Sequence, residues 1–217
     1  MIRNITTQLA LCFALLSLAL PTYSQGSNEA KAVLDKTASI VKRSGAMEIS
    51  FTASSFMSGV QKGNLAGTIY LKGRKFHIIS TNILSWYNGK NLWTLNKATN
   101  EVNVSEPTTH ERETMDPYLF IDLYRQGYSY SMKDTRLRGH DCYEIHLNAT
   151  NKRLEVKEMI LTIDKQTHLP ICVRLREGSK YWVRISLLRC KVKQKYSDSA
   201  FSFNAKDFPK AQIIDIR

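Results

Sequence analysis

Residues 169–187 read LPICVRLREGSKYWVRISL and contain two alternating segments on either side of a polar turn. Apolar side chains take every second position: Leu169, Ile171, Val173, Leu175, Tyr181, Val183, Ile185 and Leu187. Successive side chains of a β-strand point to opposite faces of the sheet, so this spacing predicts two strands that each have one apolar and one polar face. The short turn Glu177-Gly178-Ser179 makes the pair antiparallel.

The same alternation recurs along most of the chain. It predicts further strands within residues 47–52, 65–71, 76–78, 102–104, 142–147 and 158–163. The stretch 86–93, WYNGKNLW, is the strongest local signal, and its Asn88-Gly89 pair predicts a hairpin with a type I′ turn. Phe201–Phe203 is expected to form the last strand, followed by an extended tail. A row of about ten strands twists and curls, which makes its apolar face concave.

Two helices are predicted beside these strands. The first covers residues 27–43, with Ser27 as N-cap, an apolar stripe that includes Leu34 and Val41, and Gly45 as its stop. The second opens at Asp116-Pro117 and ends at Gly127, with apolar residues around almost its whole circumference. The expected fold is mainly β (α+β): a curved antiparallel sheet forming an unclosed half-barrel, covered by a lid of about two to three helices. A closed barrel with external helices is the alternative.

Composition and the first residues restrict the class of protein. The 217 residues suffice for one domain, and 43% hydrophobic with 23% charged residues exclude wholesale disorder. Residues 1–24 combine Arg3, an apolar run over Leu9–Leu20 and the small residues Thr22 and Ser24 at positions −3 and −1 of a cleavage after Ser24, which is typical of a signal peptide. A membrane anchor is the alternative, but such a run rises only about 18 Å as a helix. Residues 25–217 are therefore expected to form one exported domain.

The net charge of +12 favours an anionic binding partner. Export makes nucleic acid a poor candidate and directs attention to lipid head groups or an envelope protein. The outward-facing arginines 174, 176, 184 and 189 are interpreted as a solvated sheet face, with a docking surface as the alternative. The spacing of Cys142, Cys172 and Cys190 does not resemble a zinc site, and one disulfide could form among them.

No catalytic motif is found in the sequence. It contains no HExxH, GxSxG, phosphate-loop or GxGxxG pattern. His140-Asp141-Cys142 suggests a thiol site, but adjacency along the chain does not bring a base and a nucleophile together in space. We therefore expect no enzyme activity, no metal and no cofactor, and keep a periplasmic hydrolase as the weakest alternative.

The order of elements resembles the LolA family of periplasmic outer-membrane lipoprotein carriers. The resemblance rests on the strand ending in Phe51, the stretch from Gly67 to Phe76, the hairpin at 86–93 and the helix at 116–124. The stretch 100–107 and the IIDIR ending are similar to the branch found in Bacteroidetes-type bacteria. One departure is KGRK at residues 72–75, where many members have Arg-Pro, so Arg74 is the candidate for the family's transfer-linked arginine.

The resemblance implies a half-barrel that carries acylated lipoproteins across the periplasm, with their acyl chains in an apolar hollow. An inner-membrane release complex and an outer-membrane acceptor would be further partners of this monomer. A carrier of another lipid or glycolipid, or a lipid-sensing regulator of envelope stress, is the alternative function. Alternation places the hollow's lining at Phe51, Ile69, Phe76, Trp86, Trp93, Leu95, Leu175 and Ile185. The expected lid residues are Tyr118, Phe120, Ile121, Leu123 and Tyr124, with an ordinary core helix as the alternative.

Overall fold

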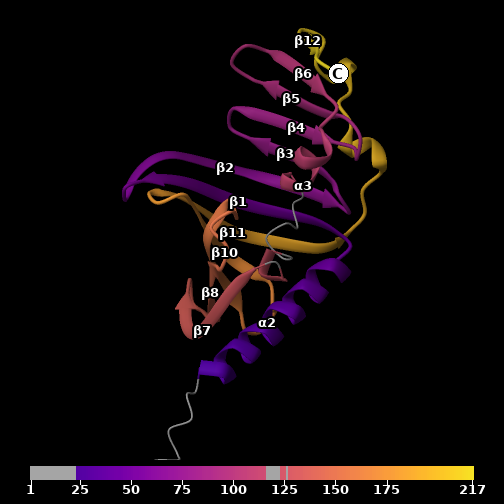
Figure 1. Cartoon of the computed structure of the whole chain (residues 1–217). Helices are drawn as coiled ribbons and strands as arrows, with labels where there is room; N and C mark the ends of the chain where they lie inside the picture. Colours follow the sequence, from indigo (N-terminus) through magenta and orange to yellow (C-terminus); the bar gives the residue numbers. More distant parts are fainter. Residues whose placement is uncertain (1–22, 116–122, 126) are drawn as a thin grey trace, which may run out of the picture.

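The computed structural model describes residues 23–115, 123–125 and 127–217 (Figure 1). Its helices are α2 (Tyr23–Arg43) and α3 (Thr109–Thr114), with 3-10 turns η1 (Leu123–Arg125), η2 (Asp198–Phe201) and η3 (Ala205–Asp207). Its strands are β1 (Ala46–Met57), β2 (Val60–Lys72), β3 (Lys75–Ser80), β4 (Ile83–Tyr87), β5 (Leu92–Asn96), β6 (Glu101–Ser105), β7 (Tyr128–Leu137), β8 (His140–Ala149), β9 (Val156–Asp164), β10 (Pro170–Glu177), β11 (Tyr181–Gln194) and β12 (Gln212–Asp215).

All strands of the described residues form one 12-stranded sheet. Its order is β12-β6-β5-β4-β3-β2-β1-β11-β10-β9-β8-β7. Two meanders, β1–β6 and β7–β11, meet where β1 pairs with β11, and the C-terminal β12 adds to β6 as a parallel edge strand. The sheet curves without closing, and α2 runs along the half built from β7–β11 (Figure 1). The prediction of a mainly β, unclosed sheet is confirmed.

The predicted lid of two to three helices is not found in the described residues. One long helix, α2, lies on the sheet there, and α3 has only six residues. The second predicted helix, from Asp116 to Gly127, lies mostly outside the described residues, and 123–125 form a 3-10 turn. The short α3 was not predicted, although Thr108 and Glu111 form a capping box in which each accepts the other's backbone N–H, at 3.3 and 2.7 Å.

Helix α2 begins earlier than predicted, at Tyr23, so Ser27 lies inside it and is not its N-cap. The predicted apolar stripe is confirmed, because its residues at 30, 34, 37 and 41 are buried together with Ala38. The end is also as predicted: Gly45 adopts a left-handed φ of 66°. The Ser44 hydroxyl donates to the carbonyl of Ile40 at 2.8 Å, which helps to satisfy the last turn.

The hairpin between β4 and β5 is confirmed, but its turn is not type I′. Tyr87 pairs with Leu92, which leaves a four-residue loop, and in that loop Gly89 takes a positive φ of 98°. The Asn88 side chain instead accepts the backbone N–H groups of Lys90 and Asn91, both at 2.9 Å. This side-chain hydrogen bonding stabilises a wider turn, because asparagine can replace a backbone acceptor.

Strand β11 is longer than predicted because a bulge interrupts its alternation. Phe51 of β1 pairs with Leu187 and Ser50 pairs with Arg189, so Leu188 is an extra residue and is 55% exposed. Beyond the bulge the even-numbered Cys190 and Val192 pack against the core, whereas Ile185 does so before it. The predicted last strand at residues 201–203 is wrong: Phe201 ends η2, and the final strand is β12 within the tail.

Candidate functional site

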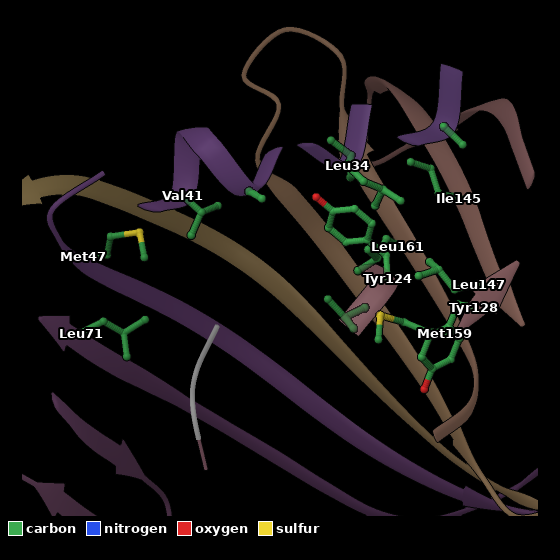
Figure 2. Packing of buried hydrophobic residues seen from close by; sticks show 14 of the residues in the cluster. Leu34, Val41, Met47, Leu71, Tyr124, Tyr128, Ile145, Leu147, Met159 and Leu161 are labelled. Carbon is green, nitrogen blue, oxygen red and sulfur yellow. The ribbon is translucent and has the colours of Figure 1, made fainter. Parts of the chain in front are cut away.

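The concave face of the sheet carries a large apolar cluster, called here the inner cluster. Its buried members include Leu34 and Val41 of α2, Met47 and Leu71 of β1 and β2, and a block from β8 and β9 that comprises Ile145, Leu147, Met159, Leu161 and Ile163. Figure 2 shows Val41 above Met47 and Leu34 near Ile145, so the helix lies over the sheet's apolar rows. Helix α2 thus covers part of this apolar surface, over the half of the sheet built from β7–β11.

Several predicted lining residues belong to the inner cluster. Phe76 is only 6% exposed, and Ile69, Leu175 and Ile185 pack against the cluster while remaining half-buried. Phe51 is also half-buried; its ring lies beside Gly67, where an added Cβ would come within 3.3 Å of Phe51 Cε1. The alternation of their strands places these residues on one face of the sheet, and their role as the lining of a ligand site stays a prediction.

Trp86, Trp93 and Leu95 do not line the hollow, which corrects the predicted set. They belong to a separate outer cluster on the opposite face, with Leu84, Val102, Val104, Phe203, Phe208 and Ala211. Trp86 and Tyr87 are neighbours on β4 and therefore point to opposite faces, and it is Tyr87 that joins the inner cluster. The C-terminal segment covers the outer face, since Phe203 and Phe208 both pack edge-on against Trp86.

Of the expected lid residues, Tyr124 can be placed. Tyr118, Phe120 and Ile121 and the side chain of Leu123 lie outside what the structure describes. Tyr124 is 3% exposed within the inner cluster, and its hydroxyl donates to the carboxylate of Asp35 on α2. Arg125 donates to the same hydroxyl at 3.0 Å and lies 3.3 Å from Asp35, which Lys31 also contacts at 2.5 Å. This polar group ties the segment before β7 to the helix.

The pKa values of the two acidic groups in this network, Tyr124 and Asp35, are shifted in opposite directions. Burial, followed by the hydrogen bond to Asp35, raises the pKa of Tyr124 to about 12. The hydrogen bonds from Lys31 and Tyr124 lower the pKa of Asp35. Asp35 is therefore ionised and Tyr124 protonated at neutral pH, which is the combination that makes the strongest hydrogen bond between them.

Tyr124→Phe is expected to loosen α2 without unfolding the protein. The change removes one hydrogen bond to a carboxylate that is 40% exposed and keeps Lys31 and Arg125, so the free energy of unfolding should fall by about 1 kcal/mol. Because the folded-state pKa of Asp35 is depressed, its contribution is present above the unfolded value and is lost as pH falls. Denaturation at pH 7 and below about pH 4 should show the difference between variant and wild type shrinking in acid. An undiminished difference would contradict this account.

The thiol site suggested by residues 140–142 has no catalytic geometry. Cys142 is buried, its Sγ donates to the backbone carbonyl of His140 at 3.3 Å, and burial raises the pKa of its thiol. The His140 ring instead contacts Asp164, with Nδ1 and Oδ2 2.6 Å apart. All three cysteines of the described residues are free, so the disulfide left open by the sequence does not form there, and no group of metal-ligating side chains is present in that part of the chain.

Two outward arginines of β10 carry ion pairs with glutamates. Arg174 contacts Glu144 at 2.8 Å and Arg176 contacts Glu158 at 3.0 Å. These pairs support the solvated-face interpretation for this part of the sheet.

A separate cleft of about 870 Å³ opens at the end of the sheet where α2 joins β1. Lys42, Lys72, Arg74 and Lys195 line it, so the structure places Arg74 in the turn between β2 and β3 at a basic cleft.

The sequence profile described as "Outer membrane lipoprotein carrier protein LolA" matches residues 20–179. The chain belongs to the LolA family. Membership of the Bacteroidetes-type branch remains a prediction. No match was found among curated proteins. None of the described helices is long and apolar enough to cross a membrane.

Several solved structures are similar to this chain at low sequence identity. An uncharacterized conserved protein from Thermus thermophilus is 12% identical, with 86% of this chain and 99% of that chain covered and a TM-score of 0.56. A putative outer membrane lipoprotein-sorting protein domain from Vibrio parahaemolyticus is 10% identical, covering 83% and 97%, at 0.42. MucB in its complex with MucA from Pseudomonas aeruginosa is 11% identical, covering 82% and 62%, at 0.42.

Proposed function

We propose that this LolA-family chain is a periplasmic carrier that binds the acyl chains of lipoproteins between α2 and the concave face of its sheet. The observation that carries the proposal is the inner cluster itself: an open sheet offers an apolar face, and α2 covers the half of it built from β7–β11. Each acyl methylene costs about 0.8 kcal/mol in water, so an acylated protein needs such a surface to leave a membrane. Cargo and α2 would compete for it, which provides a route to release.

The composition of the contact between α2 and the sheet supports the idea that cargo can displace this helix. Two of the buried positions on its inner side, Ala30 and Ala38, are small and contribute little apolar area. Thr37 is buried as well, and its hydroxyl finds no hydrogen-bond partner among the described residues. A buried, unpaired hydroxyl weakens the packing in which it lies. This helix is therefore held less firmly than a fully apolar interface would hold it.

Thr37→Val tests this property directly. Valine has the same shape without the hydroxyl, so the unfolding free energy should rise by about 1 kcal/mol. A more firmly closed α2 should then bind a fluorescent fatty-acid probe several-fold more weakly. Thermal melts and probe titrations on the same sample measure both. Ser39→Val, on the same helix at a half-buried position, is the control and should leave probe binding unchanged. Stronger probe binding by Thr37→Val would contradict competition between helix and cargo.

The molecules that co-purify with the protein identify its cargo. The full chain, including residues 1–24, is expressed in a bacterial host that has a periplasm and an outer membrane. It is purified without detergent, and bound molecules are identified by mass spectrometry. Acylated peptides would support the lipoprotein carrier. Free glycolipid would favour a carrier of other lipids or a lipid-sensing regulator, and the absence of any lipid would overturn the proposal. We further expect no turnover of ester or peptide substrates.

A further inference from the structure

The hairpin formed by β1 and β2 projects past its neighbour β3 and extends to the left of the other strands in Figure 1. Strand β3 pairs with residues 67–72 of β2, and no strand of the described residues pairs with 60–66 on that side. Every residue from 60 to 66 is exposed. A projecting, exposed hairpin adds little to the core, so its side chains are available for contact with another molecule.

Two turns meet at the end of this hairpin and form what is called here the sheet tip, residues 55–62 and 177–184. The turn residues Ser58 and Gly59 both take positive φ values, 51° and 82°, as in the tight turns that suit a twisted hairpin. The backbone N–H of Ser58 donates to the carbonyl of Lys180 at 3.0 Å, which joins this turn to the one between β10 and β11. The sheet tip is therefore an ordered extension of the sheet.

The leading side chains of the sheet tip are apolar. Met57 and Val60 are paired across the hairpin and are 42% and 58% exposed, and Tyr181 pairs with Met57 on the same face. On the opposite face Phe56 pairs with Trp182, and both side chains are half-buried. A single exposed apolar residue is common, but apolar and aromatic side chains gathered on both faces of one projection indicate an interaction site.

Basic side chains accompany these apolar residues. The sheet tip contains the exposed residues Lys62, Lys180 and Arg184 and one acid, Glu177. The guanidinium group of Arg184 lies 5.3 Å from the centre of the Phe56 ring, so charge and aromatic surface are adjacent. Lysine and arginine bury their aliphatic stems while their charged groups stay in water. The sheet tip can therefore bury apolar surface and keep its cations at the boundary with water.

We propose that the sheet tip docks onto the surface of an anionic lipid bilayer. Tryptophan and tyrosine are enriched at the boundary between head groups and acyl chains, where an aromatic ring with a polar group is favoured. Binding to such a surface increases with the apolar area inserted and with the attraction of basic residues to anionic head groups. An apolar groove on a partner protein would accommodate Met57 and Val60, but it would not by itself explain the surrounding cations. This docking does not depend on acyl-chain binding.

Flotation with phosphatidylcholine vesicles, with and without phosphatidylglycerol, tests the apolar part of the proposal. The protein is expressed from the full chain and isolated from the periplasm. The tip variant, Met57→Ser/Val60→Ser, removes apolar area at two exposed positions without changing the charge. The matched control, Leu188→Ser/Ile216→Ser, makes the same change outside the sheet tip at positions that are 55% and 65% exposed. Thermal melts check that each variant is folded.

A second pair of variants tests the charges. The charge variant removes the three cations of the sheet tip: Lys62→Gln/Lys180→Gln/Arg184→Gln. Its control removes three lysines that are exposed elsewhere: Lys36→Gln/Lys206→Gln/Lys210→Gln. Quenching of tryptophan fluorescence by brominated lipid provides a readout on the wild-type protein itself. Trp182 is the tryptophan of the sheet tip, whereas Trp86 and Trp93 belong to the outer cluster.

We expect the wild-type protein to bind vesicles that contain phosphatidylglycerol roughly tenfold or more better than phosphatidylcholine alone. The tip variant and the charge variant should each bind them roughly tenfold more weakly, and both controls within about twofold of wild type. Brominated lipid should quench the wild-type protein, and Trp182→Phe should remove most of that quenching.

Four results would overturn the proposal: no vesicle binding by wild type, equal binding to both kinds of vesicle, equal losses in variants and controls, or quenching that persists in Trp182→Phe. Vesicle binding that survives in the tip variant would also overturn it and would favour a protein partner for Met57 and Val60. Binding of a fatty-acid probe should be unchanged in the tip variant and the charge variant, so this proposal and the carrier function fail independently.

Discussion

Ile69→Glu is expected to reduce acyl binding at least tenfold while leaving the protein folded. Ile69 lies half-buried on β2, pairs with Ile49 of the neighbouring strand β1 and packs against the inner cluster. A carboxylate there would have to enter the proposed acyl-binding face, and an unpaired charge in an apolar site is costly. Because the position retains access to water, the charge can stay hydrated when no cargo is bound, so folding should survive. A fatty-acid probe titration beside a thermal melt measures the two effects.

Thr68→Glu is the matched control for this variant. Thr68 precedes Ile69 on the same strand and is also half-buried, but its side chain points to the opposite face of the sheet. The same charge is therefore introduced one residue away, on the face opposite the proposed acyl-binding surface. We expect probe binding within twofold of wild type. If both variants lost binding equally, the concave face would not be the site.

Phe201→Ala is expected to have the converse effect, with a large loss of stability and no specific loss of acyl binding. Phe201 is fully buried and is the largest such side chain in the described residues. Its ring packs edge-on against Tyr196, which packs in the same way on Tyr70 of β2. Truncation of a buried phenylalanine leaves a cavity and costs about 3–5 kcal/mol. Chemical denaturation should show this loss, while the fraction that remains folded should bind the probe with unchanged affinity.

Phe208→Ala is a graded comparison on the same segment. Phe208 is half-buried in the outer cluster, where it packs against Trp86, so its truncation should cost less than that of Phe201. A loss of probe affinity in the folded fraction of either variant would show that the outer face takes part in binding, contrary to this division of the two faces.

The strands were predictable from sequence because their cause is local. A side-chain period of two appears directly in residues such as Tyr143, Ile145 and Leu147, and it identified β8 to β11 and the face that each turns inward. The bulge at Leu188 was not predictable, since two consecutive leucines fit either face and only pairing with β1 decides between them. Strand β7 was missed although Tyr128, Tyr130 and Met132 alternate within it.

The site was less predictable because its decisive contacts are long-range. Adjacent aromatic residues at 86 and 87 give no local indication of which ring faces inward. Trp86 is covered by Phe203 and Phe208, which are more than a hundred positions away in the chain. The hydrogen bond between Tyr124 and Asp35 joins two segments with no shared motif. Arg74 lies at a cleft whose other basic residues came together only through the fold, and its transfer-linked role stays a prediction.

The joint between the two meanders also sets the order in which the protein can fold. Within each meander, strands pair with neighbours only a short turn away, so these contacts can form early at little entropic cost. The pairing of β1 with β11 joins Thr52 to Ser186 and must wait until nearly the whole chain is present. Non-local pairing of this kind slows folding and leaves apolar faces and strand edges exposed for longer. We expect slow, concentration-sensitive refolding, with aggregation competing until that central seam has formed.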